Sequence, residues 1–163
     1  MDVFDRLAAI DDRYASRPVA EAFDWSSVAA TLAVGQEWYL VAFRSIRRSG
    51  ADEARLCAFD DRAHAEAAAA PGFVHYYRGP TMDDGRCLSF CLWDSRADAR
   101  TAAVRPAHRE AVALIDEMYE RYTLEFLRVS RTSDAPELRF EPYETRPATD
   151  LASQPLSVRP APA

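Results

Sequence analysis

Two residue types are missing from this chain, lysine and asparagine. Every one of the 20 basic side chains is therefore an arginine, and the 26 acidic side chains outnumber them, so the net charge is -6. The arginines are interleaved with acids, and their tightest group is Arg44, Arg47 and Arg48. Because a nucleic-acid surface needs a basic stripe that neutralises phosphates, we expect no nucleic-acid partner.

Long apolar runs and paired cysteines are missing as well. No apolar stretch approaches the roughly 20 residues that cross a bilayer, and the first residues, MDVFDRLAAIDDRY, are acidic where a secretory signal is basic. The 3 cysteines are an odd number without paired spacing. The sequence also lacks a glycine-rich phosphate loop and a nucleophile elbow. We expect a cytoplasmic protein with free thiols, no membrane partner, no metal site and no nucleotide.

The first 36 residues are predicted to form a helical extension. Apolar side chains recur at helical spacing from Asp2 to about Ser16, which indicates an amphipathic helix. A second short helix should follow Asp24-Trp25, with Ser26 or Ser27 as its N-cap.

Residues 37–143 are predicted to form the main domain, and residues 144–163, which are rich in proline and alanine, a disordered tail. The expected order is a strand (38–46), a helix (51–70), a hairpin (73–78 and 87–93), a helix restarted at Pro106 and running to 122, and a strand (123–129). Ser95 and Asp98 have the spacing of a capping box at a helix start. Leu138 and Phe140 indicate a short strand that Pro142 confines to an edge.

This order predicts an α+β fold of the ferredoxin-like βαββαβ kind, an antiparallel sheet with both helices on one face. Both faces of the predicted strands are apolar, as Leu40 against Val41 and Leu92 against Cys91 illustrate. The face away from the helices then needs a cover. Homodimerisation through the sheets, which gives a dimeric α/β barrel, would supply it.

A further pattern follows the hairpin: a strand ending in Leu92-Trp93, an acid, a capped helix, the histidine His108 on that helix, and a final strand. With it, the chain from Trp38 to Val129 resembles the dimeric α/β-barrel superfamily, in its antibiotic-biosynthesis-monooxygenase-like branch. The resemblance implies one of several activities, among them cofactor-independent oxidation of aromatic polyketides, haem degradation and haem-dependent catalysis. Haem degraders of this superfamily combine an asparagine, a tryptophan and a histidine; Trp93 and His108 match the last two, but this chain has no asparagine.

The candidate site combines groups for proton transfer with an aromatic lining. His108, on a helix, is the expected proton-transfer group, and His75 with Tyr77 on a strand could orient a phenolic substrate. The expected lining residues are Trp93, Tyr119, Phe43 and Phe90. The plainer alternatives are a surface histidine at 108, and a core network or dimer contact at 75 and 77.

Three functions stay open at this stage. The first is a small-molecule-binding protein that acts as a cofactor-independent monooxygenase, or a related enzyme, on an aromatic or polyketide-like ligand in an apolar pocket. The second is a haem-binding or haem-dependent enzyme with His108 as axial ligand. The third is a non-catalytic dimeric module. The first and third need no cofactor.

Overall fold

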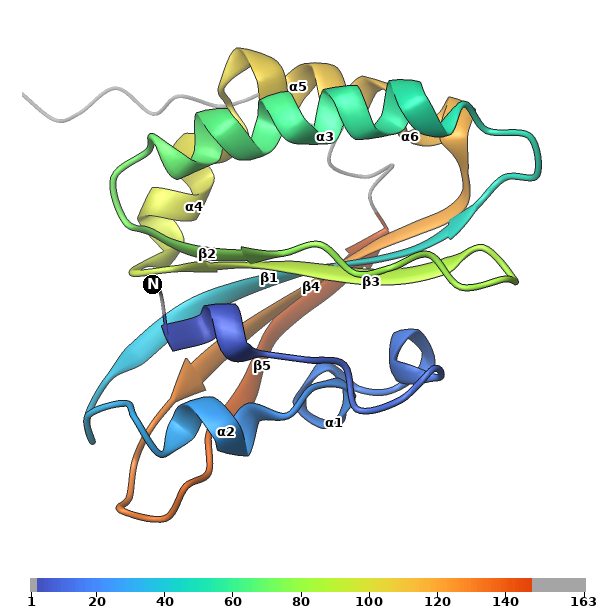
Figure 1. Ribbon diagram of the computed structural model, residues 1–163. Coiled ribbons are helices and arrows are strands. Elements are labelled where there is room, and N and C mark those ends of the chain that lie inside the picture. Colours follow the sequence, from blue (N-terminus) through green and yellow to red (C-terminus); the bar gives the residue numbers. More distant parts are fainter. Residues whose placement is uncertain (1–2, 148–163) are drawn as a thin grey trace, which may run out of the picture.

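The computed structural model describes residues 3–147, which form one five-stranded antiparallel sheet with the order β2-β3-β1-β4-β5 (Figure 1). The strands are β1 (Glu37–Arg47), β2 (Phe73–Tyr77), β3 (Arg86–Trp93), β4 (Tyr119–Ser130) and β5 (Arg139–Pro147). All four neighbouring pairs are antiparallel, including the predicted β2–β3 hairpin. The α+β, ferredoxin-like fold class is confirmed.

One face of this sheet carries four helices: α3 (Glu53–Ala68), α4 (Arg96–Ala103), α5 (Pro106–Ala113) and α6 (Ile115–Met118) (Figure 1). Two predicted helix starts on this face, at Ser95 and at Pro106, are present. The Ser95 hydroxyl accepts a hydrogen bond from the Asp98 amide at 3.2 Å, and Pro106 is the first residue of α5, where its missing amide proton costs nothing.

The helix that was predicted to run to residue 122 ends at Met118, because β4 begins at Tyr119. β1 is longer than the sequence suggested, and Arg47 at its end pairs with Tyr119 across a bulge. The backbone hydrogen bonds to β1 thus hold the segment YERYTLEF in a strand, although its apolar residues are spaced in part as in a helix. Tyr119 and Tyr122 are strand residues.

The N-terminal segment, residues 3–32, lies on the opposite face of the sheet (Figure 1). It contains the short 3-10 helices η1 (Val3–Arg6) and η2 (Tyr14–Ser16) and the helices α1 (Val19–Ala22) and α2 (Trp25–Ala29). The single helix predicted up to Ser16 is wrong. Asp11 accepts hydrogen bonds from the Arg13 amide and the Arg17 guanidinium, a local turn that competes with helix formation. The cap of α2 is Asp24 rather than Ser26 or Ser27.

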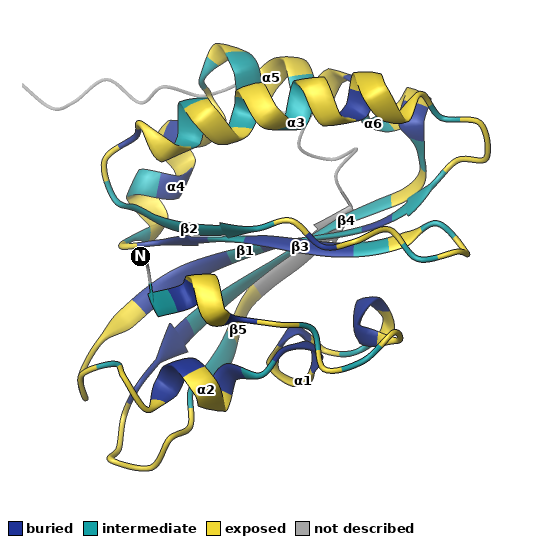
Figure 2. Cartoon of the chain, in the orientation of Figure 1, coloured by how far each residue is buried: buried dark blue, intermediate teal, exposed yellow. Residues whose placement is uncertain are grey.

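This segment covers the sheet face for which a second copy of the chain was expected. Its aromatic side chains, among them Phe4, Phe23 and Trp25, join the sheet residues in one buried cluster. Figure 2 colours parts of α1 and α2 as buried. The expectation that this face needs a partner subunit is therefore corrected: the chain covers it with its own residues. A dimer interface would then lie on another part of the surface.

Arg44 fastens the N-terminal segment to the sheet. Its guanidinium forms an ion pair with Glu125 at 2.5 Å and donates hydrogen bonds to the carbonyl oxygens of Ala15 and Arg17. One side chain of β1 therefore bridges a β4 carboxylate and the end of η2.

Two further expectations concern the periphery of the fold. The predicted tail began at residue 144, but β5 continues to Pro147; residues 148–163 lie outside the described part of the chain. Within the described part, no helix is both long and apolar enough to cross a membrane.

Candidate functional site

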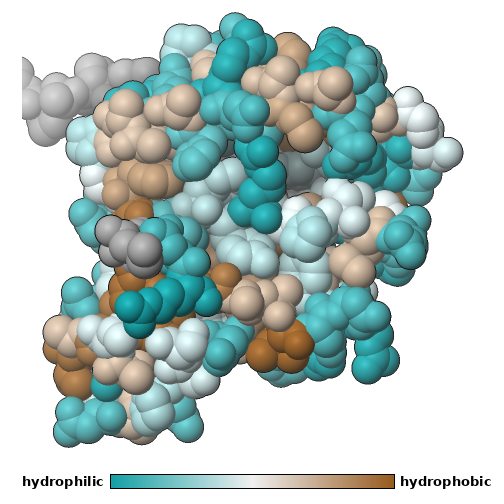
Figure 3. All heavy atoms as spheres, in the orientation of Figure 1, coloured by the Kyte–Doolittle hydropathy of each residue, from teal (hydrophilic) through white to brown (hydrophobic). Residues whose placement is uncertain are grey.

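The face of the sheet toward the helices is much less tightly covered than the other face. Its central side chains alternate along the strands with the buried ones and are only half-buried (Figure 2). These residues, which define what we call the cleft, are Val41, Phe43, Tyr76, Cys91, Tyr122 and Phe126. Figure 3 shows the surface hollowed between the helical layer and the sheet.

The helices above the cleft contribute little to its closure. The α3 helix has 16 residues but one buried side chain, Leu56, and α5 has none. The hydrophobic contacts between the layers lie in two separate clusters, one around Trp93 with Ala70 and Ala99, the other around Leu56 with Met118. The two layers are therefore held together at the ends of the cleft, with half-buried side chains between.

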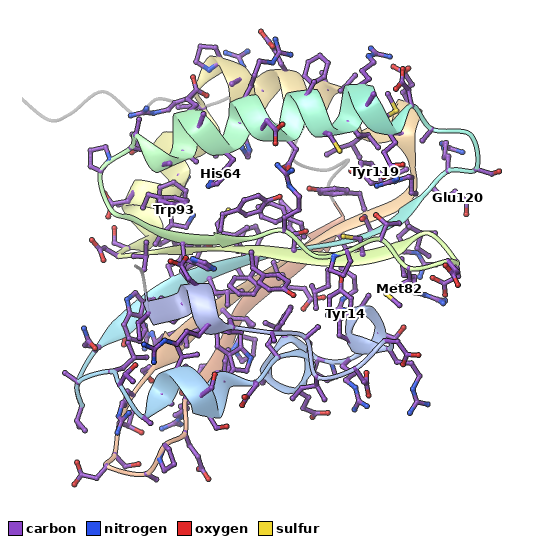
Figure 4. The ribbon with its side chains drawn as sticks, viewed as in Figure 1. Tyr14, His64, Met82, Trp93, Tyr119 and Glu120 are labelled. Carbon is purple, nitrogen blue, oxygen red and sulfur yellow. The ribbon has the colours of Figure 1, made fainter. Side chains whose placement is uncertain are left out.

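Two of the side chains labelled in Figure 4, Trp93 and Tyr119, lie at these two ends. Trp93 is at the end where β3 leads into α4, and its ring packs edge-on against Phe73 at 5.3 Å. Tyr119 lies at the other end, beside Met118 and Leu56, and its ring is 5.1 Å from that of Tyr122. Three of the four predicted lining residues, Trp93, Tyr119 and Phe43, thus lie on the helix side of the sheet.

The phenol groups of Tyr119 and Tyr122 are available to a ligand. Neither hydroxyl hydrogen-bonds to another group in the described part of the chain, and neither oxygen is among the buried polar atoms that lack a partner, all of which belong to Arg131. Both oxygens therefore reach space that a water or a ligand can fill. Burial raises the pKa of Tyr119 to about 12 and the pKa of Tyr122 well above its usual value, so both phenols stay protonated at neutral pH.

Tyr76 links the sheet to a charged side chain of the helical layer by a hydrogen bond. Its hydroxyl donates to both carboxylate oxygens of Asp60 on α3, at 2.9 and 3.1 Å, and Arg78 pairs with the same carboxylate at 2.5 Å. The structure places the His64 ring against the Tyr76 ring, 4.9 Å away, and gives the carboxylate to Tyr76 and Arg78.

His108 lies in the first turn of α5, next to α3. The Glu66 carboxylate of α3 accepts hydrogen bonds from the amides of Ala107 and His108, at 3.0 and 3.3 Å, and so caps the α5 helix from outside. Burial lowers the pKa of the His108 imidazole, and the Glu66 charge opposes that effect in part. At neutral pH His108 is thus a half-buried, neutral imidazole, the form that accepts a proton.

His75, Tyr77 and Phe90 lie on the other face of the sheet. A bulge between Phe73 and His75 reverses the alternation of β2, so His75 and Phe73 point to opposite faces. His75 packs against Phe4 and lies 3.8 Å from Asp5, while Tyr77 stacks on Phe90 at 5.5 Å. The structure therefore does not bring the predicted group His108, His75 and Tyr77 together, because the bulge, which no sequence pattern indicated, turns His75 and Tyr77 away from the helices.

The sequence prediction did not select Asp60, Tyr76, Tyr122 or Phe126 for the site. The alternation of side chains along these strands could be predicted from the sequence. Which of the side chains face the helices could not, because β4 begins earlier than expected and β2 contains the bulge. All three cysteines are free thiols, and no group of three metal-ligating side chains occurs among residues 3–147.

Comparisons with known proteins agree with this architecture. A family model described as PB2B2.08-like matches residues 2–142, which include both the N-terminal segment and the sheet. Among solved structures, Rv0793 from Mycobacterium tuberculosis is 20% identical with a TM-score of 0.50, over 60% of this chain and 98% of that one. SnoaB from Streptomyces nogalater, a cofactor-independent oxygenase, is 19% identical with a TM-score of 0.47, over 63% of this chain and all of that one. No curated protein matches significantly.

Proposed function

Because this chain belongs to the PB2B2.08-like family, whose match includes the N-terminal segment and the sheet that it covers, we propose one function for the whole unit. The protein binds a planar aromatic or polyketide-like small molecule in the cleft. The observation that supports this proposal is the contrast between the two sheet faces. Aromatic side chains line the helix side, where they stay half-buried, and apolar half-buried walls with a few polar groups are typical of ligand sites.

The proposed reaction is a cofactor-independent oxidation of the bound molecule. His108, neutral at physiological pH, takes a proton from the ligand, and the electron-rich anion reacts with molecular oxygen. One oxygen atom enters the product and the other leaves as water, with all electrons supplied by the ligand. Phe43 contacts the ring system, and Trp93 and Tyr119 bound the cleft at its two ends.

Binding and turnover are tested separately. Equilibrium dialysis with 2-methoxynaphthalene, a neutral planar probe, should show saturable binding. Cys91→Phe, which fills the centre of the cleft between Val41 and Tyr76, should abolish it. Oxygen uptake with a panel of hydroxylated naphthalenes should then be lost in His108→Ala without loss of binding. Equal probe binding by wild type and Cys91→Phe would overturn the cleft assignment, and unchanged uptake in His108→Ala would overturn the role of His108.

Haem is the second candidate occupant, favoured by the neutral imidazole of His108, which is the form that ligates iron. If His108 holds haem, the cleft aromatics would contact the porphyrin, and bound haem would supply redox chemistry. A haem titration should then give a saturable Soret shift that disappears in His108→Ala. No shift in wild type would remove this candidate and leave the cofactor-independent one.

A further inference from the structure

The contact between Tyr76 and Asp60 joins the helical layer to an outer strand of the sheet. Tyr76 belongs to β2, and the pairing of Tyr76 with Cys91 places it among the cleft residues. Its hydroxyl spans both oxygens of the Asp60 carboxylate, and Arg78 holds that carboxylate together with the neighbouring Asp61, at 2.5 and 2.6 Å. The carboxylate is thus fixed by a cation on one side and a phenol on the other.

This arrangement determines what the Tyr76 oxygen can still do. A phenol has one proton to donate, and here Asp60 receives it. The Arg78 guanidinium also hydrogen-bonds to this phenol, which leaves the oxygen one lone pair to accept a hydrogen bond from a ligand. Donation to a carboxylate makes the oxygen a better acceptor, because hydrogen bonds in a chain polarise one another. Burial and the Asp60 charge both raise the pKa of Tyr76, so the phenol does not ionise at neutral pH and its direction of donation is fixed.

The other tyrosines of the cleft differ in this respect. Tyr119 and Tyr122 make no hydrogen bond to another group in residues 3–147, so their hydroxyls can turn to donate or to accept. They do not distinguish a ligand donor from a ligand acceptor. Among the cleft tyrosines, Tyr76 is the one whose hydroxyl proton is already donated to a neighbouring residue, Asp60.

We propose that Tyr76 determines the ligand specificity of the cleft: its oxygen, held as an acceptor by Asp60, selects an aromatic molecule that presents a hydroxyl or N–H donor at the β2 side. Asp60 is a positioning residue, which acts through Tyr76 and does not touch the ligand. This proposal rests on the proposed function, because it assumes that the cleft binds an aromatic molecule. It adds a requirement on the ligand and names the side of the ring system that must meet it.

The test compares two probes of the same ring system by equilibrium dialysis at pH 7. The probe 2-naphthol can donate a hydrogen bond, whereas 2-methoxynaphthalene can only accept one. Wild type should bind 2-naphthol about tenfold more tightly, which corresponds to about 1.4 kcal/mol. Tyr76→Phe should reduce that ratio to about one, and Asp60→Asn should reduce it in part.

Tyr77→Phe is the matched control. It removes a hydroxyl from the next residue of the same strand, on the face covered by the N-terminal segment, where the ring packs against Phe23 at 4.8 Å. The probe ratio should stay at its wild-type value. Equal binding of both probes by wild type, or loss of the ratio in Tyr77→Phe and not in Tyr76→Phe, would overturn the proposal while the binding function stands. Failure of wild type to bind either probe would overturn both.

Should Tyr76→Phe fail to fold, Asp60→Asn provides an independent measurement, because it keeps the shape of the side chain and removes the charge. An Asp60→Asn protein that binds 2-methoxynaphthalene like wild type and retains the full tenfold preference would also contradict the proposal.

Discussion

The two faces of this sheet are made of the same kinds of residue and yet are covered very differently. Along β1, Leu40 and Ala42 point to one side and are 0% exposed, whereas Val41 and Phe43 point to the other side and stay half-buried. Along β3, Phe90 and Leu92 are sealed and Cys91 between them is not. The strand residues alone therefore do not decide which face becomes core and which becomes a site. The elements packed against each face decide it.

The covering elements differ in shape and in side-chain length. The N-terminal segment consists of short turns that follow the sheet surface and insert large aromatic rings into it, as Trp25 does against Phe90 at 5.3 Å. The α3 helix is a straight rod rich in alanine, with the sequence EARLCAFDDRAHAEAA. Alanine side chains are too short to fill the space between the helix and the strands. The contacts at the two ends of the helical layer then act as spacers that keep the cleft open.

Truncating one aromatic side chain on each face should give the largest difference. Phe90→Ala removes a ring that is 0% exposed, so it should lower the free energy of unfolding by about 3–5 kcal/mol. Phe126→Ala on the helix side should cost about 1–2 kcal/mol, because the ring is half-buried and leaves less of a new cavity. Urea unfolding of both variants measures the difference, and equal costs would mean that the helix face is as well packed as the other.

Detaching the N-terminal segment should have the next largest effect. Arg44→Met keeps the aliphatic stem but removes the bonds to Glu125 and to the carbonyl oxygens of Ala15 and Arg17. We expect the free energy of unfolding to fall by about 2 kcal/mol. This is less than the cost of breaking a fully buried ion pair, because both side chains are partly exposed.

Hydrogen exchange locates this loss. Amide protection should fall first in residues 13–18, around η2, while the helical layer stays protected. An Arg44→Met protein that loses protection equally in α3 would contradict the assignment of Arg44 to the segment. Arg47→Met is the control on the same strand, since Arg47 contacts Thr81 and Glu53 instead.

A homodimer remains a prediction, and the comparison of the two faces constrains it. With residues 3–32 in place, a second copy has no access to the sealed face. We expect a dimer in sedimentation equilibrium whose formation leaves amide exchange in these residues unchanged, because the interface lies elsewhere, for instance along the outer strand β5. Faster exchange in these residues on dimerisation would show that the partner displaces the segment.

Much of the fold could be predicted from the sequence because its signals are local. The hairpin turn at Asp84-Gly85, the Ser95 cap and the restart at Pro106 each depend on a few neighbouring residues, and all are present. The end of the last helix could not be predicted in this way. Whether Tyr119 is helical or extended depends on its pairing with Arg47, more than 70 residues earlier in the chain.

The site was only partly predictable for the same reason. Trp93 and Phe43, which were predicted to line the site, lie on the helix side of the sheet, whereas His75 and Tyr77 lie on the other face because a single bulge reverses the strand alternation. The cover of the second face was missed because the N-terminal residues were read as a docking helix of unknown target. Their spacing does not reveal that Ile10 points to solvent while Tyr14 is buried.

The smallest effect should appear in the dependence of stability on pH, and it concerns the less covered face. Burial lowers the pKa of His108 in the folded protein below the value of about 6.5 that is usual for histidine. As the pH falls through that value, the unfolded chain takes up a proton at this residue and the folded chain does not, so stability is lost.

His108→Gln removes the titration. The free energy of unfolding of wild type, minus that of His108→Gln, should therefore decrease between pH 7.5 and pH 5.5 in urea titrations. A difference that is flat over this range would mean that His108 is as hydrated in the folded protein as in the unfolded one. In that case the cleft would be open to solvent beside α5, and the neutral imidazole that the proposed proton transfer requires would not be favoured by the fold.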